Sequence, residues 1–210
     1  MLFKALIKSV VAGDSSQVKE TVQSMLDAGT KPLDIVQKGL IAGMDVVGIN
    51  FKVGDMFVPE VLMAAAAMKD GVEVVKPHLL VGDMPSLGTI AIGTVKGDLH
   101  DIGKNLLAMM MESGGFTVIN VGVDIEAEEF VRVAVEQKAD IIAISALLTT
   151  TMLGMKDTVD LLKEKGLLGK IKVIIGGAPI SQKFCDEIGA SGFAPDAARA
   201  VELCKKLLSA

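Results

Sequence analysis

The sequence has no tryptophan and no tyrosine, and its aromatic residues are seven phenylalanines. A core built from this composition must be aliphatic and rich in methionine, and aromatic stacking on a base or a sugar is not expected. The chain also lacks a basic run, and its net charge is −5. Both features argue against nucleic acid as a partner, because phosphate backbones are bound mainly by clustered Lys and Arg.

Cysteine and long apolar runs are equally scarce. Cys185 and Cys204 form no C-x-x-C pair and cannot build a disulfide framework, so we expect reduced thiols. No apolar run approaches the ~18 residues of a membrane span. The first residues resemble a signal peptide only superficially, because Lys4 and Lys8 interrupt apolar positions that fall on one helical stripe. We therefore expect a cytoplasmic protein that does not associate with membranes.

Two regimes of hydrophobic periodicity divide the chain. Apolar residues recur with helical spacing in four stretches, at 3–10, 18–26, 33–47 and 61–75. Asp14 or Ser15 can cap the second helix, and Pro32 suits the first turn of the third. Four amphipathic helices with short connections predict an antiparallel four-helix bundle over residues 1–83.

After a Gly-, Pro- and Ser-containing linker at about 80–88, short β-like runs alternate with helical ones. The pattern predicts strands at 89–95, 117–121, 140–146, 172–175 and 192–194, with helices near 103–112, 126–138, 152–165, 181–188 and 196–209. The first and third strands are apolar on both faces, which is typical of a covered parallel sheet. We predict a doubly wound, flavodoxin- or Rossmann-like α/β domain over residues 89–210, with a five-stranded parallel sheet and its ligand at the carboxyl ends of the strands.

The end of the first strand carries the most informative stretch, GTVKGDLHDIGKN at 93–105, with one of only two histidines. A lone loop histidine often bonds only the backbone. Asp98, however, can accept the second imidazole N–H of His100, which is the usual arrangement behind a metal-ligating histidine. Gly97 and Gly103 permit a tight loop and the close approach of a bulky group. Asp101 suits the cap of the next helix better than a ligand role.

Two common kinds of site fit this loop badly. One His and two Asp supply at most part of a zinc or magnesium shell. A dinucleotide site would need G-x-G-x-x-G, which is absent, and the acidic residues would repel a pyrophosphate. A metal that arrives with most of its ligands supplied needs only one from the protein, which points to a tetrapyrrole-like cofactor.

Three motifs at three strand ends carry a resemblance to cobalamin-binding domains. Asp98–Gly103 matches D-x-H-x-x-G, Ser145–Leu147 matches S-x-L, and Gly176-Gly177 matches the third motif. The segment DLHDIGKN is similar to that of methionine synthase and of the corrinoid methyl-carrier proteins of methylotrophic and acetogenic methyltransferase systems. KVGDMFVPEVLMAAAAM, at 52–68, resembles the end of the helical cap that precedes the cobalamin domain in those proteins. The resemblance covers nearly the whole chain.

The resemblance implies a cobamide cofactor whose cobalt takes His100 as its lower axial ligand, with the cofactor's own benzimidazole displaced. Asp98 would hold His100, and Thr151, where methionine synthase has a serine, would complete a His–Asp–hydroxyl relay. Ser145 and Thr149 would hydrogen-bond the displaced nucleotide tail, for which Gly176 and Gly177 would leave room. Asp124 would cap a helix or contact the corrin rim. Further cofactor contacts are expected from Gly97, Leu99, Asp101, Ile102, Gly103, Leu147 and Phe193, and from Phe57 and Val61 in the cap.

The function implied by the resemblance is methyl transport. The chain would carry a methyl group from a substrate-specific methyltransferase to a second methyltransferase that serves tetrahydrofolate or a thiol, with a corrinoid-reducing activase as a further partner. The helical part would be an apolar lid, hinged at 80–88. One alternative is the cobalamin subunit of an adenosylcobalamin mutase, but the helical part argues against it. A second alternative is a cobalamin-sensing regulator, but we expect no residues to be left for its output module.

Overall fold

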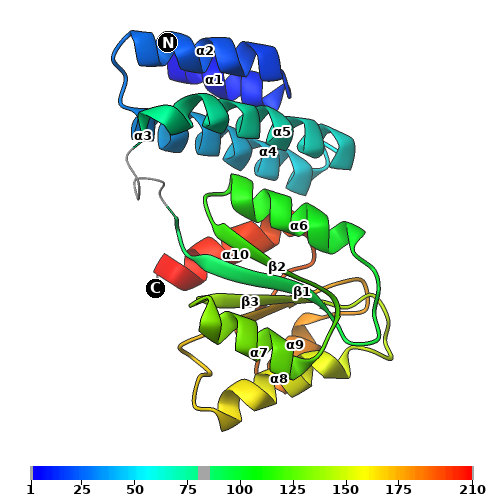
Figure 1. The fold of residues 1–210 in the computed structure, drawn as a ribbon. Coiled ribbons are helices and arrows are strands. Elements are labelled where there is room, and N and C mark those ends of the chain that lie inside the picture. The colour runs from blue at the N-terminus through cyan, green and yellow to red at the C-terminus, as the bar shows by residue number, and fades with distance from the viewer. Residues whose placement is uncertain (1, 80–85, 210) are drawn as a thin grey trace. The chain divides into compact units, whose positions relative to one another are not determined.

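The computed structural model describes residues 2–79 and 86–209 (Figure 1). The chain divides into two compact units, residues 1–86 with the short segment 113–115, and residues 87–112 with 116–210. Most of the expected linker, residues 80–85, lies outside the described residues. No helix within the described part of the chain is long and apolar enough to cross a membrane.

The first unit is the predicted four-helix bundle. Its elements are α1 (Leu2–Val11), α2 (Ser15–Asp27), α3 (Pro32–Ile35), η1 (Val36–Ile41), α4 (Ala42–Val53), α5 (Val58–Val75) and the short η2 (Lys76–His78). The third predicted helix is one helical run made of α3, η1 and α4, in which η1 is π-helical. The Asp14 side chain caps α2 by accepting the Gln17 N–H at 3.0 Å, and Pro32 stands in the first turn of α3, as the sequence predicts.

The bundle core is aliphatic and fully buries Val61 of α5. Val61 shares its helix face with Ala65 and Met68, which are also buried. The side chain of Val61 is thus part of the bundle core, and its expected contact with a cofactor stays a prediction. Phe57, the N-cap residue of α5, is 68% exposed. The end of α4 and the start of α5 carry several exposed apolar side chains, here called the apolar patch: Ile49, Val53, Phe57, Val58, Leu62 and Met63.

The second unit is the predicted α/β fold. Its elements are β1 (Thr89–Val95), α6 (Ile102–Ser113), β2 (Thr117–Ile125), α7 (Ala127–Glu136), β3 (Ile141–Ser145), α8 (Leu153–Glu164), β4 (Lys172–Gly176), α9 (Gln182–Ile188), β5 (Gly192–Phe193) and α10 (Ala197–Ser209). The five strands are parallel in the order β2-β1-β3-β4-β5. Figure 1 shows α6 and α10 on one face of the sheet, and α7, α8 and α9 on the other.

This strand order places a topological switch point between β1 and β3. The chain leaves β1 toward β2 on one side, whereas β3, β4 and β5 follow on the other. The connections after β1 and β3 therefore run in opposite directions, and the carboxyl end of the sheet at such a point is where folds of this kind bind ligands. β1 and β3 are almost completely buried, as their apolar sequences predict.

The one strand whose extent departs clearly from prediction is β2. It continues to Ile125, beyond the predicted end at Val121, and its residues are partly buried or exposed without a regular alternation. Its pairing with β1 shifts register between Ile92 and Gly93 and again between Gly93 and Val95. Each shift places an extra residue in β2, so the end of this strand is bulged.

Candidate functional site

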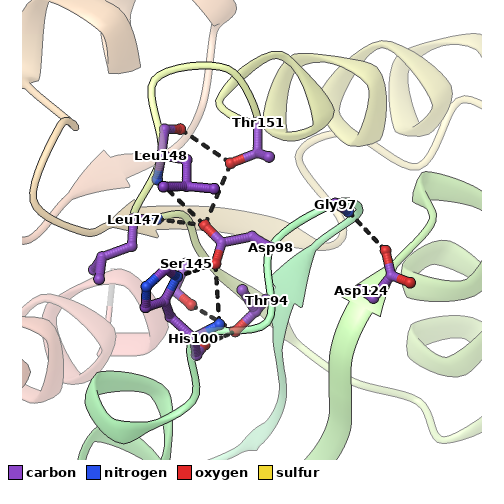
Figure 2. A network of polar contacts seen from close by, with 9 residues as sticks. All are labelled: Thr94, Gly97, Asp98, His100, Asp124, Ser145, Leu147, Leu148 and Thr151. Atoms are coloured by element: carbon purple, nitrogen blue, oxygen red, sulfur yellow. Dashed lines mark hydrogen bonds and ion pairs between the residues drawn. The ribbon is translucent and has the colours of Figure 1, made fainter.

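The loop between β1 and α6 brings His100 and Asp98 together, as the sequence predicts. Asp98 is completely buried, whereas the His100 side chain is 52% exposed. The Asp98 Oδ1 atom lies 2.7 Å from His100 Nδ1 and also accepts the His100 backbone N–H at 3.0 Å (Figure 2). An ionised carboxylate only accepts, so the imidazole proton resides on Nδ1. In the neutral ring the Nε2 lone pair is then free for a metal.

The second carboxylate oxygen of Asp98 ties this loop to the turn after β3. Oδ2 accepts the backbone N–H groups of Leu147 at 2.6 Å and of Leu148 at 3.3 Å. Burial acts to raise the pKa of Asp98, but the N–H donors of Leu147 and His100 and the nearby imidazole outweigh it and lower that pKa to about 2. Asp98 is therefore ionised throughout the physiological pH range.

Thr151 also reaches this carboxylate, but its hydroxyl is shared. Its Oγ1 atom lies 3.3 Å from Asp98 Oδ2 and 3.0 Å from the carbonyl oxygen of Leu148. A hydroxyl has one proton, so it cannot donate fully to both acceptors. The three residues of the expected His–Asp–hydroxyl set are thus neighbours, with the hydroxyl held partly by the backbone.

Ser145 has a neighbour that the sequence did not reveal. Thr94 and Ser145 are paired across β1 and β3, and their hydroxyl oxygens lie 3.0 Å apart. The Thr94 hydroxyl is fully buried and donates to the His100 carbonyl at 2.9 Å. Thr94 thus fixes the backbone of the histidine. Thr94 could have been predicted from the sequence, because it is a polar residue near the end of an apolar strand and pairs with the serine of the S-x-L motif. Thr149 is exposed in the turn after β3.

Gly176, the last residue of β4, and Gly177, which follows it, have a packing role within this unit. A Cβ atom on Gly177, whose φ is +127°, would lie 1.9 Å from the Ala146 carbonyl oxygen. A Cβ on Gly176 would lie 2.8 Å from the Ala194 carbonyl oxygen. Both glycines therefore let the ends of neighbouring strands approach closely, and the space beside their Cα atoms is filled by the protein's own backbone. Phe193 of β5 is partly buried against the core of this unit.

Asp101 and Asp124 complete the loop. Asp101 immediately precedes α6, where its backbone carbonyl accepts the Asn105 N–H at 2.7 Å and its carboxylate accepts from the Asn105 amide. Asp124 does not cap a helix, since α7 begins at Ala127 with Glu126 as its N-cap. Its carboxylate instead accepts the N–H of Gly97 at 2.6 Å (Figure 2).

The surface around His100 suits a large, mostly apolar ligand. Leu99 and Ile102, on either side of His100 in the sequence, are 72% and 81% exposed, and Leu147 is 45% exposed. A Cβ added to Gly103 would meet nothing within 4 Å, so the start of α6 is open. Exposed apolar side chains around an available imidazole nitrogen are what a corrin ring with an axial metal requires. The residues present therefore fit a cobamide.

Comparisons with known proteins identify the family of this chain. Two B12 binding domain models match the chain, one over residues 88–202 and the other over residues 2–76. A corrinoid protein of Desulfitobacterium hafniense is 46% identical over 210 residues, covering 99% of this chain and 97% of that protein. Dimethylamine corrinoid protein 3 of Methanosarcina acetivorans is 43% identical over 207 residues, covering 99% and 97%.

Solved structures give the same result for the fold. The methanol:cobalamin methyltransferase complex of Methanosarcina barkeri contains a chain that matches with a TM-score of 0.86 and 31% identity, covering 99% of this chain and 80% of that one. A cobalamin-binding protein of D. hafniense matches with a TM-score of 0.83 and 31% identity, covering 98% of both chains. The fold and the site define a cobalamin-binding protein. The chain belongs to the B12-binding corrinoid proteins, and its cofactor is a cobamide, as the sequence motifs predict.

The buried Asp98 carboxylate should make the stability of the protein without cofactor depend on pH. Its pKa of about 2 lies below the ordinary value of 3.8. The ionised form therefore stabilises the fold above about pH 4, and this stabilisation is lost as the pH falls toward 2. Asp98→Asn should cost about 2 kcal/mol of unfolding free energy near neutral pH and weaken the loss of stability in acid. Denaturant unfolding followed by circular dichroism measures both effects.

Asp157→Asn is the matched control, because Asp157 is an exposed carboxylate in α8. That variant should behave like the wild type at each pH. Equal stability of the Asp98→Asn variant and the wild type near neutral pH would contradict the assignment of Asp98 as an ionised, stabilising group.

Proposed function

We propose that this protein carries a methyl group on a cobamide held with its own benzimidazole displaced and His100 as the lower axial ligand. The observation that carries the proposal is the pairing of a half-exposed imidazole, whose Nε2 is available, with a buried carboxylate that fixes Nδ1. When bound, the cobamide supplies a cobalt centre that accepts and releases a methyl group. The remaining chemistry concerns what the residues of the chain do.

Asp98 fixes both the tautomer and the direction of the His100 ring. Four donors from His100, Leu147 and Leu148 hold its two oxygens, so rotation of the carboxylate would break several hydrogen bonds at once. The negative charge behind Nδ1 also raises the electron density that the ring offers at Nε2. His100 can thus act as a directed axial ligand, and Thr151 supports the same carboxylate with a shared hydroxyl.

The partners that we propose are two methyltransferases, one specific for the methyl donor and one that delivers the methyl group to tetrahydrofolate or a thiol, together with a reducing activase. The first partner is supported by the similarity to a chain in a methanol:cobalamin methyltransferase complex. The names of the similar proteins, which include dimethylamine and trimethylamine corrinoid proteins, support small methylated compounds as donors. The second methyltransferase and the activase follow from the need to unload the methyl group and to restore a reduced cobalt.

Removal of the His100 ring tests the axial ligand. In the cobamide-loaded protein, His100→Ala should abolish the absorption features of an imidazole-ligated cobalt, because the nearby Asp98 carboxylate is buried and already occupied by N–H donors. His78→Ala is the matched control, since His78 is the other histidine of the chain and is exposed in η2. An unchanged spectrum in the His100 variant would rule out His100 as the ligand.

A carrier should depend on its partners. Protein loaded with a methylated cobamide should transfer methyl to tetrahydrofolate or to a thiol at enzymatic rates only after a cognate methyltransferase is added. The measurement is methylated acceptor formed over time, with and without that enzyme. Transfer at enzymatic rates by the loaded protein alone would show that the chain is an autonomous methyltransferase and would contradict the proposal.

The exposed apolar patch of the bundle supports the further proposal that Phe57 shields the methyl-bearing face of the cofactor. A methyl–cobalt bond is light-sensitive and reduced cobalt is easily oxidised, so an apolar cover would protect both. Phe57→Ala should raise the rate of oxidation of the reduced, loaded protein by several-fold. Leu33→Ala, which removes an exposed apolar side chain of α3 outside the patch, should not. Absorption changes after exposure to air measure the rate, and equal rates in the two variants would count against the shielding role.

A further inference from the structure

We propose that Asp124 of β2 is a positioning residue for His100, and that it acts by holding the backbone of the loop at Gly97 and Asp98. This inference rests on the proposed role of His100 as the cobalt ligand. It adds a further support to the loop that carries the histidine, on the side of the loop opposite to the β3 turn. Figure 2 shows Asp124 reaching Gly97 from β2, while Leu147, Leu148 and Thr151 surround the Asp98 carboxylate.

Asp124 holds the loop through two hydrogen bonds. Its side-chain Oδ1 accepts the Gly97 N–H at 2.6 Å, and its backbone N–H donates to the Asp98 carbonyl at 3.1 Å. The two hydrogen bonds hold the consecutive residues Gly97 and Asp98, and the side chain of Asp98 is the carboxylate that orients His100. A charged acceptor on a backbone N–H is among the stronger hydrogen bonds available in a protein.

The backbone of Asp124 is in an unusual conformation that makes this grip possible. Its φ is +58°, and Lys138 is the only other non-glycine residue with a positive φ in the described part of the chain. Such conformations are uncommon for residues with a side chain and persist only where the surroundings impose them. Asp124 also lies in the bulged end of β2, where the pairing with β1 shifts register. Bulges often re-aim a side chain beside a functional site.

A neighbouring ion pair fastens the same two segments. Lys96, at the start of the loop, pairs with Glu126, which directly follows β2. Both partners are largely exposed, so the pair itself is weak. Its position nevertheless means that residues 96, 97 and 98 each contact the end of β2 or the residue that directly follows it. Of the two hydrogen bonds that Asp124 makes to the loop backbone, the one from the Gly97 N–H to its carboxylate is the shorter.

Four variants separate the carboxylate from the backbone conformation. Asp124→Ala removes the acceptor and leaves an unfavourable positive φ. Asp124→Gly removes the acceptor but permits that φ. Asp124→Asn keeps both an oxygen acceptor and a tolerance for positive φ. Lys138→Gly permits the same conformation at the end of α7, away from the loop, and is the matched control.

The first measurement is hydrogen exchange at the Gly97 amide in the protein without cofactor, with amides of β3 as the internal reference for global stability. Asp124→Ala and Asp124→Gly should speed exchange at Gly97 by about 10-fold or more, as expected for loss of a hydrogen bond to a charged group. Asp124→Asn and Lys138→Gly should stay within about threefold of the wild type. Unchanged exchange at Gly97 in the Ala and Gly variants would overturn the proposal.

The second measurement asks whether Asp124 acts through His100. The cobamide dissociation constant is measured for the wild type, Asp124→Ala, His100→Ala and the double variant. Loss of Asp124 should weaken binding by about 10-fold when His100 is present and by less than about twofold when it is absent. Equal weakening in both backgrounds would mean a direct contact with the cofactor or a general structural role, and would overturn the proposal. If His100→Ala leaves the cobamide affinity and the absorption spectrum unchanged, the proposed function fails. Hydrogen exchange at Gly97 then still tests whether Asp124 holds the Gly97 amide.

Discussion

The carboxylate of Asp98 is the group on which the site depends. A completely buried charge is costly unless donors surround it, and here the backbone N–H groups of His100, Leu147 and Leu148 do so. Meeting this requirement draws the loop after β1 against the turn after β3. It also leaves the remaining lone pairs of Oδ1 facing His100 Nδ1. One electrostatic constraint therefore fixes the loop, the tautomer of the ring and the nitrogen that is available for cobalt.

The topology of the sheet makes this arrangement possible. Because β1 and β3 are neighbours while their connections run in opposite directions, the two loops meet at the carboxyl edge without a helix between them. The buried hydroxyl of Thr94 adds a hold on the His100 carbonyl, and the bulged end of β2 grips the other side of the loop. A ligand group supported from several strands is placed more accurately than one on a free loop. The histidine can thus be half exposed and still well oriented.

Much of this could be predicted from sequence, and the failures have physical reasons. β1 and β3 were predictable because they are apolar on both faces, and D-x-H-x-x-G located His100 and Asp98. The end of β2 was missed because its mixed burial gives no clear period. Of the two roles expected for Asp124, a helix cap or a contact with the corrin rim, the cap is wrong because Glu126 occupies that position. The complete burial of Val61 could not be predicted, because helical spacing shows which residues share a face of the helix but not how deeply each of them is buried. The role of Gly177 depends on the Ala146 carbonyl, a contact between distant segments that sequence spacing cannot reveal.

The most direct test of the central claim is electron paramagnetic resonance of the protein loaded with Co(II) cobamide, with and without ¹⁵N-labelled histidine. An axial nitrogen splits the cobalt lines according to its nuclear spin. If His100 is the ligand, labelling should convert the ¹⁴N triplets into ¹⁵N doublets, and His100→Ala should remove the histidine splitting while His78→Ala retains it. Triplets that survive complete labelling would show that the cofactor's own benzimidazole is the ligand, and would contradict the account.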